Sequence, residues 1–503
     1  MSNPKFDVVI VGGGFSGTVL AAQLLRRIPD LSLAVIDNGL LPGRGVAYGA
    51  KHPCHLLNVP AANMSALPDQ PEHFLRWAQV NHDPSVQATS FLPRALYGQY
   101  VASLLEEVKS KSGASNFRWI QGQVSSFASE PSRVNVQLTG GSILATRVLV
   151  LAVGNFPPPN INVPGLSDGC KRYVPHPWSA AALKGIPKNG SVLLIGSGLT
   201  SVDVTLALKS QGFAGHIHIL SRRGLMPQPH GEKRQWPQFW NERSPRTIRG
   251  LLRLVRNQLR AASDAGCDWR SVIDALRPVT QKIWQSLPFD ERKRFLRHVR
   301  PYWDAHRHRM PSEVSDGISS LLHGGQATLY AGRITNYREF SDYAEIAFRD
   351  RKTRAERLLR VDRVINCAGP ETDYRRMDAP LIKRLLAQRV VRPDPLFLGL
   401  DVDANGALIA SSGNPSPFLY AIGPVRKGFL WETTAVPELR EQASQLASHL
   451  AHQFASRFED EGADNSDSLP LSLAGFSRRP SRTDQQTDQK SCRPIATVSN
   501  VHR

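Results

Sequence analysis

The sequence predicts an α/β protein built from two similar parallel-sheet domains, and three observations support this fold class. Near the N-terminus an apolar run of strand length leads into a glycine-rich turn and then a helical segment, and the same order recurs near residue 191. A strand–turn–helix unit of this kind begins a parallel βαβ arrangement. The length of 503 residues and a hydrophobic content of 41% are sufficient for several domains with buried cores.

The first unit contains a strand at 5–11, a helix at about 15–27 and a second strand at 31–36. Its turn reads G-x-G-x-x-G, and Asp37 follows the second strand, twenty residues after the last glycine. Such glycines permit a tight turn, approach of a pyrophosphate to the backbone and close packing of helix on strand, while the acid can bind ribose hydroxyls. The residues expected to contact this dinucleotide are Gly12, Gly14, Phe15, Ser16, Gly17 and Asp37.

The second unit contains a strand at 191–195, a helix at 199–209 and a strand at 216–220. Its turn reads G-x-G-x-x-S, and two arginines follow the last strand where an acid would favour NAD. Arginine at this position accommodates a 2′-phosphate, so NADPH is expected, although both arginines could also be ordinary surface charges. The expected contacts of this second dinucleotide are Gly196, Gly198, Leu199, Thr200, Ser201, Arg222 and Arg223.

An acid-bearing dinucleotide fold followed by an arginine-bearing one indicates an FAD site followed by an NADPH site. Strands at 147–153 and 361–369 look like crossings between two domains, and a third such segment at 417–424 precedes a helix at about 437–454. The predicted fold is therefore two Rossmann-like domains, with the FAD-binding domain interrupted by the NADPH-binding one. The predicted parts are 1–185 (FAD-binding, first part), 186–364 (NADPH-binding, with a helical insertion at about 224–315), 365–456 (FAD-binding, second part) and 457–503 (disordered tail).

Charge and cysteine usage limit the possible partners. Lys and Arg number 62 against 43 Asp and Glu, a net charge of +19, which raises nucleic acid, anionic lipid or phosphorylated ligands as partners. Within the insertion, 246–260 predicts an amphipathic helix with an arginine stripe, which is more often a solvated face than a binding site. No nucleic-acid-binding signature and no transmembrane segment is recognised, and five scattered cysteines favour a cytoplasmic protein. The sequence makes no prediction of oligomeric state.

Two kinds of chemistry are disfavoured by the motifs. The chain has no C-x-x-C, which argues against a flavin-linked disulfide reductase. The H-R-H-R segment beginning at His306 supplies two imidazoles among cations that repel a metal ion, so no metal site is expected.

With these motifs in place, the chain resembles two-dinucleotide-domain FAD/NAD(P)-binding oxidoreductases over roughly 5–455. It is similar to a largely uncharacterised bacterial family and, more distantly, to amine N-hydroxylating and other class B flavin monooxygenases. The segments that carry the family likeness are GRGVAYG (43–49), HLLNVPAANMS (55–65), FLPRALYGQY (91–100) and YWDAHRHRM (302–310).

The resemblance implies that Asn58 and Met64 lie beside the flavin, and that Gly423 and the following helix meet its pyrimidine edge. Many relatives carry Gly-Asp at this turn, whereas here Pro424 follows, so the acid contact to ribitol is in doubt. No catalytic residue is identified; the candidates are Asn58, Arg94, His306 and Trp431.

The implied function is hydride transfer from NADPH to FAD, with the reduced flavin and molecular oxygen hydroxylating a small amine or similar nucleophile. Two alternatives stay open. One is an NADPH-dependent flavin reductase or dehydrogenase without oxygen chemistry. The other is a non-enzymatic flavoprotein whose basic insertion binds nucleic acid or membrane.

Overall fold

The computed structural model describes residues 5–49, 52–112, 116–130, 133–167, 169–179, 181–232 and 234–464, with only the backbone at 112 and 457–464. The chain divides into two compact units, Met1–Gln453 and Phe454–Arg503. Both sheets and the candidate site lie in the first unit. The tail is predicted to begin at 457, and the backbone of 457–464 continues a helix. Residues 465–503 lie outside the described part.

The first sheet has the strand order β14–β15–β6–β1–β2–β3, with the antiparallel pair β4–β5 attached to β6. Its strands are β1 (Lys5–Val11), β2 (Leu33–Asp37), β3 (Phe117–Gln121), β4 (Val124–Glu130), β5 (Arg133–Leu138), β6 (Ile143–Leu151), β14 (Ala407–Ile409) and β15 (Pro415–Ala421). Strands β15, β6, β1, β2 and β3 run parallel, so their carboxyl ends meet at one edge. Ligands of open α/β sheets bind at this edge.

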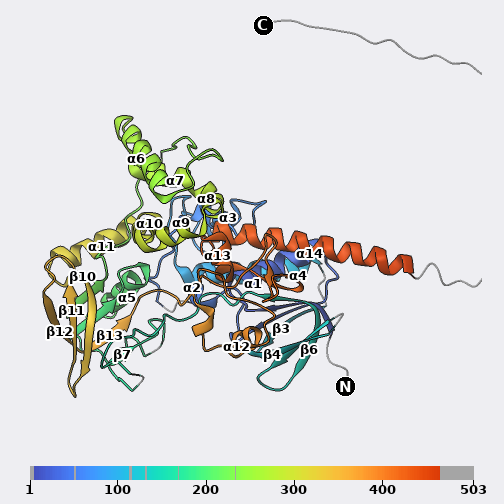
Figure 1. The fold of residues 1–503 in the computed structure, drawn as a ribbon, viewed down its shortest axis with the longest axis horizontal. Helices are drawn as coiled ribbons and strands as arrows, with labels where there is room; N and C mark the ends of the chain where they lie inside the picture. The colour runs from blue at the N-terminus through green and yellow to red at the C-terminus, as the bar shows by residue number, and fades with distance from the viewer. Residues whose placement is uncertain are drawn as a thin grey trace, which may run out of the picture. The chain divides into compact units, whose positions relative to one another are not determined.

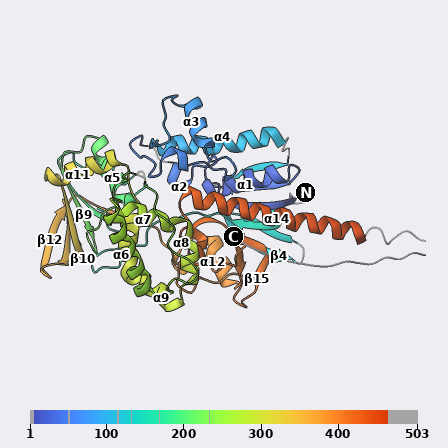
Figure 2. The same ribbon diagram turned by 90° about the horizontal axis from the view of Figure 1, so that it is seen from above.

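The helices of the described chain follow the two glycine turns, form the insertion or close the fold. They are α1 (Phe15–Arg27), α2 (Gly45–Tyr48), α3 (His73–Asn81), α4 (Arg94–Ser112), α5 (Leu199–Ser210), α6 (Ile248–Asp264), α7 (Trp269–Leu276), α8 (Thr280–Ser286), α9 (Phe289–Arg294), α10 (Arg300–Arg307), α11 (Ser312–His323), α12 (Pro380–Ala387), α13 (Lys427–Leu430) and α14 (Val436–Asp464). Helix α1 packs beside α4, and Arg27 at its end donates a 2.9 Å hydrogen bond to Ser444 of α14 (Figure 2).

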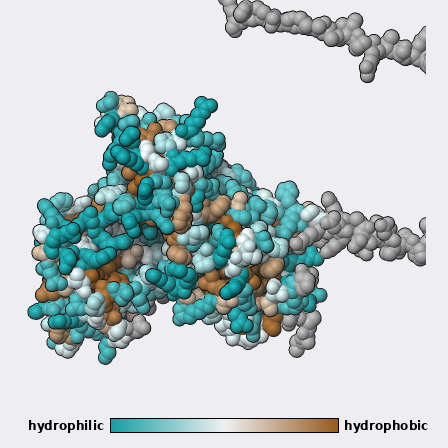
Figure 3. Space-filling view, viewed as in Figure 1, coloured by the Kyte–Doolittle hydropathy of each residue, from teal (hydrophilic) through white to brown (hydrophobic). Residues whose placement is uncertain are grey.

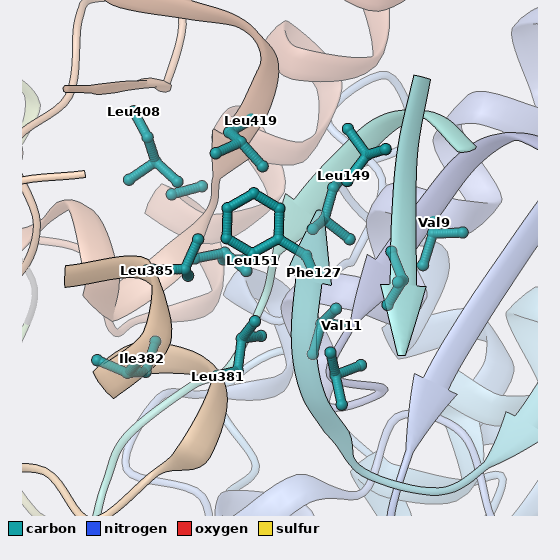
Figure 4. Close-up of a cluster of buried hydrophobic side chains, with 14 of the residues drawn as sticks. Val9, Val11, Phe127, Leu149, Leu151, Leu381, Ile382, Leu385, Leu408 and Leu419 are labelled. Carbon is teal, nitrogen blue, oxygen red and sulfur yellow. The ribbon is translucent and has the colours of Figure 1, made fainter. Parts of the chain in front are cut away.

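Burial explains why β1 has no polar alternation. Its residues Val8, Val9 and Ile10 have no exposed surface, because helices cover one face and the β4–β5 pair and α12 cover the other. Figure 4 shows the hydrophobic core on the face that α12 covers. There Val9, Val11 and Phe127 of the sheet belong to one cluster with Leu385 of α12. A strand buried on both faces is typical of parallel sheets.

The second sheet has the order β12–β11–β10–β9–β8–β13–β7. Its strands are β7 (Tyr173–Val174), β8 (Ser191–Ile195), β9 (His216–Ser221), β10 (Ala327–Glu339), β11 (Ala344–Asp350), β12 (Glu356–Val361) and β13 (Arg363–Asn366). Strands β7 to β10 and β13 pair in parallel, whereas β10, β11 and β12 form an antiparallel meander (Figure 1). The predicted fold class, two Rossmann-like α/β domains, is confirmed.

Strand pairing moves the predicted domain limits. β7 precedes the predicted range 186–364 and β13 ends two residues after it, yet both pair within the second sheet. The sheet therefore takes chain from 173 to 366. The two-residue strand β7 is too short to give an apolar pattern in the sequence.

The insertion is helical from 248 onward, whereas the described residues of 224–247 form no helix or strand. The predicted amphipathic helix corresponds to α6, and Thr247 caps it by accepting a hydrogen bond from the Gly250 amide. The arginine stripe is solvent-exposed at Arg246, Arg249, Arg253, Arg256 and Arg260. In Figure 3 hydrophilic residues likewise cover most of the visible face. None of the described helices combines the length and the apolar character that crossing a membrane requires.

Candidate active site

The first glycine turn is a backbone cradle at the carboxyl edge of the first sheet. Gly12 has φ +107°, and a Cβ there would collide with the carbonyl oxygen of Ala152. A Cβ at Gly17 would collide with the carbonyl oxygen of Gly12, so helix α1 can approach the strand only with glycine. A Cβ built at Gly14 would lie 3.6 Å from the Gly45 Cα, so at this point the turn approaches another glycine backbone with no side chain between them. This geometry fits close approach of a dinucleotide pyrophosphate.

Asp37 ends β2 beside this turn. Its Oδ2 accepts a 2.6 Å hydrogen bond from the Gly13 amide, and its Oδ1 accepts one of 2.6 Å from the Gly39 amide. The carboxylate is thereby oriented at the sheet edge, where a ribose of a dinucleotide would lie. Trp119 of β3, which sequence reasoning missed, packs over Gly13 and donates a 3.2 Å hydrogen bond to the Gly39 carbonyl oxygen.

Phe15 and Ser16 open helix α1 and point in different directions. The Phe15 ring stacks on Tyr97 of α4, with centroids 6.0 Å apart. Tyr97 in turn donates a 2.8 Å hydrogen bond to the carbonyl oxygen of Met64, whose side chain is buried. Phe15 and Met64, both expected at the flavin site, are therefore joined through Tyr97.

Gly423 lies against the same turn. It has φ +84°, and a Cβ there would stand 3.0 Å from the Ser16 hydroxyl. Its amide donates a 3.0 Å hydrogen bond to Gln442 Oε1 on α14. The end of β15 thus meets the first glycine turn, as a flavin site shared by both parts of this domain requires.

The second glycine turn resembles the first at its first glycine and differs from it at its third position. Gly196 has φ +111°, and a Cβ there would collide with the carbonyl oxygen of Cys367. Nothing lies within 4 Å of a Cβ built at Gly198, so its backbone is open to a ligand. Ser201 replaces the third glycine and donates a 2.7 Å hydrogen bond to the Gly198 carbonyl oxygen. Leu199 and Thr200 begin α5 above this opening, both half-buried.

The two arginines after β9 do different things. Arg223 donates a 3.1 Å hydrogen bond to the carbonyl oxygen of Arg297, in the π-helical turn between α9 and α10, and its guanidinium lies 5.3 Å from the Tyr302 ring centroid. Arg222 is exposed, and none of the described side chains pairs with it. Of the two, Arg222 is the guanidinium available to an incoming phosphate.

A cavity of about 460 Å³ opens between the first domain and the insertion. Residues from 58–63 and 432–435 form one side, and residues from 230–236, 271–277 and 307–309 form the other. Its volume suits a small ligand. Asn58 lies in its wall, and the Asn58 carbonyl oxygen is 2.9 Å from His230 Nε2.

Charged side chains form a connected series along this wall. Arg277 and Arg307 pair with Glu438 at 3.0 Å and 3.3 Å, and Arg307 is 4.0 Å from Glu432. Arg309 pairs with Asp274 at 2.8 Å. Within the described residues, no group of three or more His, Cys, Asp or Glu side chains could hold a metal ion.

Of the four candidate catalytic residues, only Asn58 lines the cavity. Arg94 pairs with Asp203 of α5 at 2.8 Å. The His306 ring packs against Trp269, and its Nδ1 lies 2.7 Å from the Tyr302 carbonyl oxygen. Trp431 stacks on Trp284, with centroids 5.0 Å apart. Tertiary packing uses these three side chains, which a linear sequence cannot reveal.

Comparison with known proteins agrees with this architecture. Residues 9–156 match the model of a protein family described as FAD-NAD(P)-binding. No curated protein matches the chain.

Several solved structures share the fold at low identity. L-lysine 6-monooxygenase from Pseudomonas syringae superposes with a TM-score of 0.63 at 16% identity, over 89% of this chain and 99% of that one. Ornithine N-hydroxylase from Kutzneria sp. 744, in a complex with reduced FAD, NADP+ and L-ornithine, gives 0.58 at 14%, over 90% and 100%. Thioredoxin reductase from Lactococcus lactis gives 0.50 at 11%, over 90% and 99%. The chain has the fold of FAD/NAD(P)-binding oxidoreductases.

Proposed function

We propose that this FAD-NAD(P)-binding protein is a flavoenzyme that oxidises NADPH and hydroxylates a small amine with molecular oxygen. The single observation that carries the proposal is the 460 Å³ cavity, which places the Asn58 segment opposite a polar wall supplied by the insertion. When bound, FAD and NADPH would supply hydride transfer and oxygen activation. The chain's own residues bind and orient these groups and exclude water.

The two cradles fit their expected cofactors. Gly12 and Gly17 permit the tight turn and the close approach of α1, and Gly14 keeps the backbone open to the pyrophosphate of FAD. Asp37 can accept hydrogen bonds from the adenosine ribose. Gly198 leaves the corresponding space for NADPH, and Arg222 offers an unengaged guanidinium to the 2′-phosphate. Both cofactors are thus matched by exposed glycine backbone and by one charged side chain each, the Asp37 carboxylate for FAD and the Arg222 guanidinium for NADPH.

The amine specificity is supported by two of the similar structures, which carry L-lysine and L-ornithine in their names, and by the polar wall of the cavity. The alternative function, a flavin reductase or dehydrogenase without oxygen chemistry, is supported by the similarity to thioredoxin reductase. That alternative would need another acceptor, because the sequence contains no C-x-x-C. The third reading, a nucleic-acid- or membrane-binding flavoprotein, rests only on the exposed arginines of α6.

The deciding experiment is a coupled assay. Purified protein is supplied with FAD, and NADPH oxidation is followed with L-lysine, L-ornithine, simple diamines and aromatic acids. We expect a flavin absorbance spectrum, amine-stimulated NADPH oxidation and one hydroxylamine formed for each NADPH consumed. Amine-independent NADPH oxidation without hydroxylamine would favour the reductase, and a protein that takes up no flavin would end the proposal.

A further inference from the structure

A histidine and a glutamate from different parts of the chain meet at the cavity wall. His308 follows the last residue of α10, and Glu432 lies between α13 and α14. His308 Nε2 is 3.9 Å from Glu432 Oε2, within ion-pair range when the imidazole is protonated. The side chain of His308 is 38% exposed, since it faces the cavity, whereas that of Glu432 is 6% exposed. The histidine can thus contact a ligand in the cavity, and the buried carboxylate lies on the Nε2 side of its ring.

Glu432 is held in place and kept ionised by its neighbours. Trp303 Nε1 donates a 3.0 Å hydrogen bond to Glu432 Oε1. Burial favours the neutral acid, but Arg307, His308 and the Trp303 hydrogen bond together hold the pKa of Glu432 below its ordinary value. The preceding residue, Trp431, has φ +64°, a left-handed conformation that non-glycine residues rarely adopt. The surrounding packing therefore fixes where Glu432 points.

His308 has charged neighbours on three elements. Glu432 and Asp304 favour its protonated form, while Arg307 of α10 and Lys427 of α13 oppose it. Burial is the largest influence and lowers the pKa of His308. A neutral imidazole with a carboxylate behind Nε2 keeps its proton on that nitrogen, which leaves the Nδ1 lone pair to accept another.

Hydroxylation of an amine requires a group in the site that removes a proton from the substrate. An alkylamine has a pKa of about 10 and enters the cavity as an ammonium ion, which has no lone pair for attack. Some group must take one proton before nitrogen can react. The other acidic cavity group is poorly placed, because both oxygens of Asp274 are engaged by Arg309 at 2.8 Å and 3.1 Å.

We infer that His308, supported by Glu432, is the proton acceptor for the substrate ammonium in the reaction proposed above. The N–H bond of the ammonium breaks, an N–H bond forms at His308, and the imidazolium is stabilised by the Glu432 carboxylate. The proton is later returned to the water that leaves. The sum balances: ammonium, oxygen and NADPH give hydroxylamine, water and NADP+, with no further proton consumed. This inference rests on the proposed function.

Two variants test the role of His308. His308→Gln removes the acceptor, and Glu432→Gln keeps an acceptor oxygen for Trp303 but removes the charge. We expect His308→Gln to lower kcat/KM for L-lysine, or for the panel amine that turns over best, about 100-fold near neutral pH. Its rate should then rise about tenfold per pH unit toward the pKa of the amine, near about 10. A flatter profile is expected for the wild type, and for His323→Gln, an exposed histidine on α11, as the matched control.

A second readout does not depend on turnover. NMR titration of the His308 ring should show its pKa falling in Glu432→Gln, because the charge that favours the imidazolium is lost. The acid limb of the kcat/KM profile should move to lower pH in the same variant.

The possible results distinguish failure of the role of His308 from failure of the proposed amine hydroxylation. A His308→Gln enzyme that forms hydroxylamine with the wild-type pH profile, or a His308 titration unmoved by Glu432→Gln, overturns the role of His308 alone. A wild-type enzyme that binds FAD but hydroxylates no amine overturns the proposed function and the role of His308 with it.

Discussion

Arg94 at the start of α4 and Asp203 in the middle of α5 form an ion pair of 2.8 Å, with side chains 16% and 7% exposed. The pair links a helix of the first dinucleotide fold to a helix of the second. Arg94 Nε also donates a 3.0 Å hydrogen bond to the carbonyl oxygen of Leu56, two residues before Asn58. Arg94, suggested as catalytic, thus contacts the segment that enters the cavity and an acid of the second fold.

This pair predicts a pH-dependent stability. Burial raises the pKa of Asp203 to about 6, although Arg94 opposes the shift. Since the unfolded carboxyl titrates near about 4, the folded state holds an extra proton between these values, and folding becomes more favourable as pH falls through that window. Asp203→Asn cannot bind this proton. The Tm of the wild type should therefore rise relative to that of Asp203→Asn when pH is lowered from about 7 to about 5.

The exposed Asp316→Asn on α11 is the control, and its Tm difference from the wild type should not change with pH. Parallel Tm curves for wild type and Asp203→Asn would contradict the assignment.

The two glycines of the second turn should respond differently to alanine. Gly196→Ala forces a Cβ into the Cys367 carbonyl at φ +111° and should lower the free energy of unfolding by at least about 1–3 kcal/mol. Gly198→Ala meets no atom within 4 Å and should leave Tm unchanged, yet its methyl group projects where NADPH is expected. The KM for NADPH should rise about tenfold in Gly198→Ala. Thermal melts and steady-state kinetics of both variants check this, and an unchanged KM would place the cofactor elsewhere.

Arg222 and Arg223 should separate in their effects on cofactor choice. A charge-assisted hydrogen bond to phosphate contributes about 1.5–3 kcal/mol, so Arg222→Ala should reduce the ratio of kcat/KM for NADPH over NADH about 10- to 100-fold. Arg223→Ala should change this ratio less, because its guanidinium is already engaged by the Arg297 carbonyl and the Tyr302 ring. Equal losses in both variants would show that Arg223 leaves those contacts when NADPH binds.

Trp431 should prove structural. Its ring is 6% exposed, stacks on Trp284 and meets Phe295 edge-on at 5.0 Å. Trp431→Ala should cost about 3–5 kcal/mol of stability through the cavity it leaves. The exposed Phe289→Ala, at 44% exposure, should cost much less. Thermal melts compare the two, and a Trp431→Ala protein with wild-type Tm but slow flavin reduction would restore the catalytic assignment.

The sequence by itself determined the elements that repeat a local physical rule. Strand β1 and helix α1 follow from an apolar run and a glycine turn, and Gly12 and Gly196 are required by positive φ values that other residues avoid. Asp37 and Arg222 could also be placed, because Asp37 ends its strand and Arg222 follows the end of the next dinucleotide fold's second strand, which fixes both at a sheet edge.

The tertiary structure alone decided which distant side chains meet. His308 and Glu432 are separated by more than a hundred residues, and neither segment indicates in the sequence that the two side chains meet. The same holds for Arg94 with Asp203, and for β7, whose two residues gain strand geometry only by pairing with β13. Local periodicity encodes how a segment packs, but the partner of a buried charge depends on how segments pack against one another. The glycine turns expected to bind the cofactors can therefore be predicted from the sequence, whereas the residues that form the cavity wall cannot.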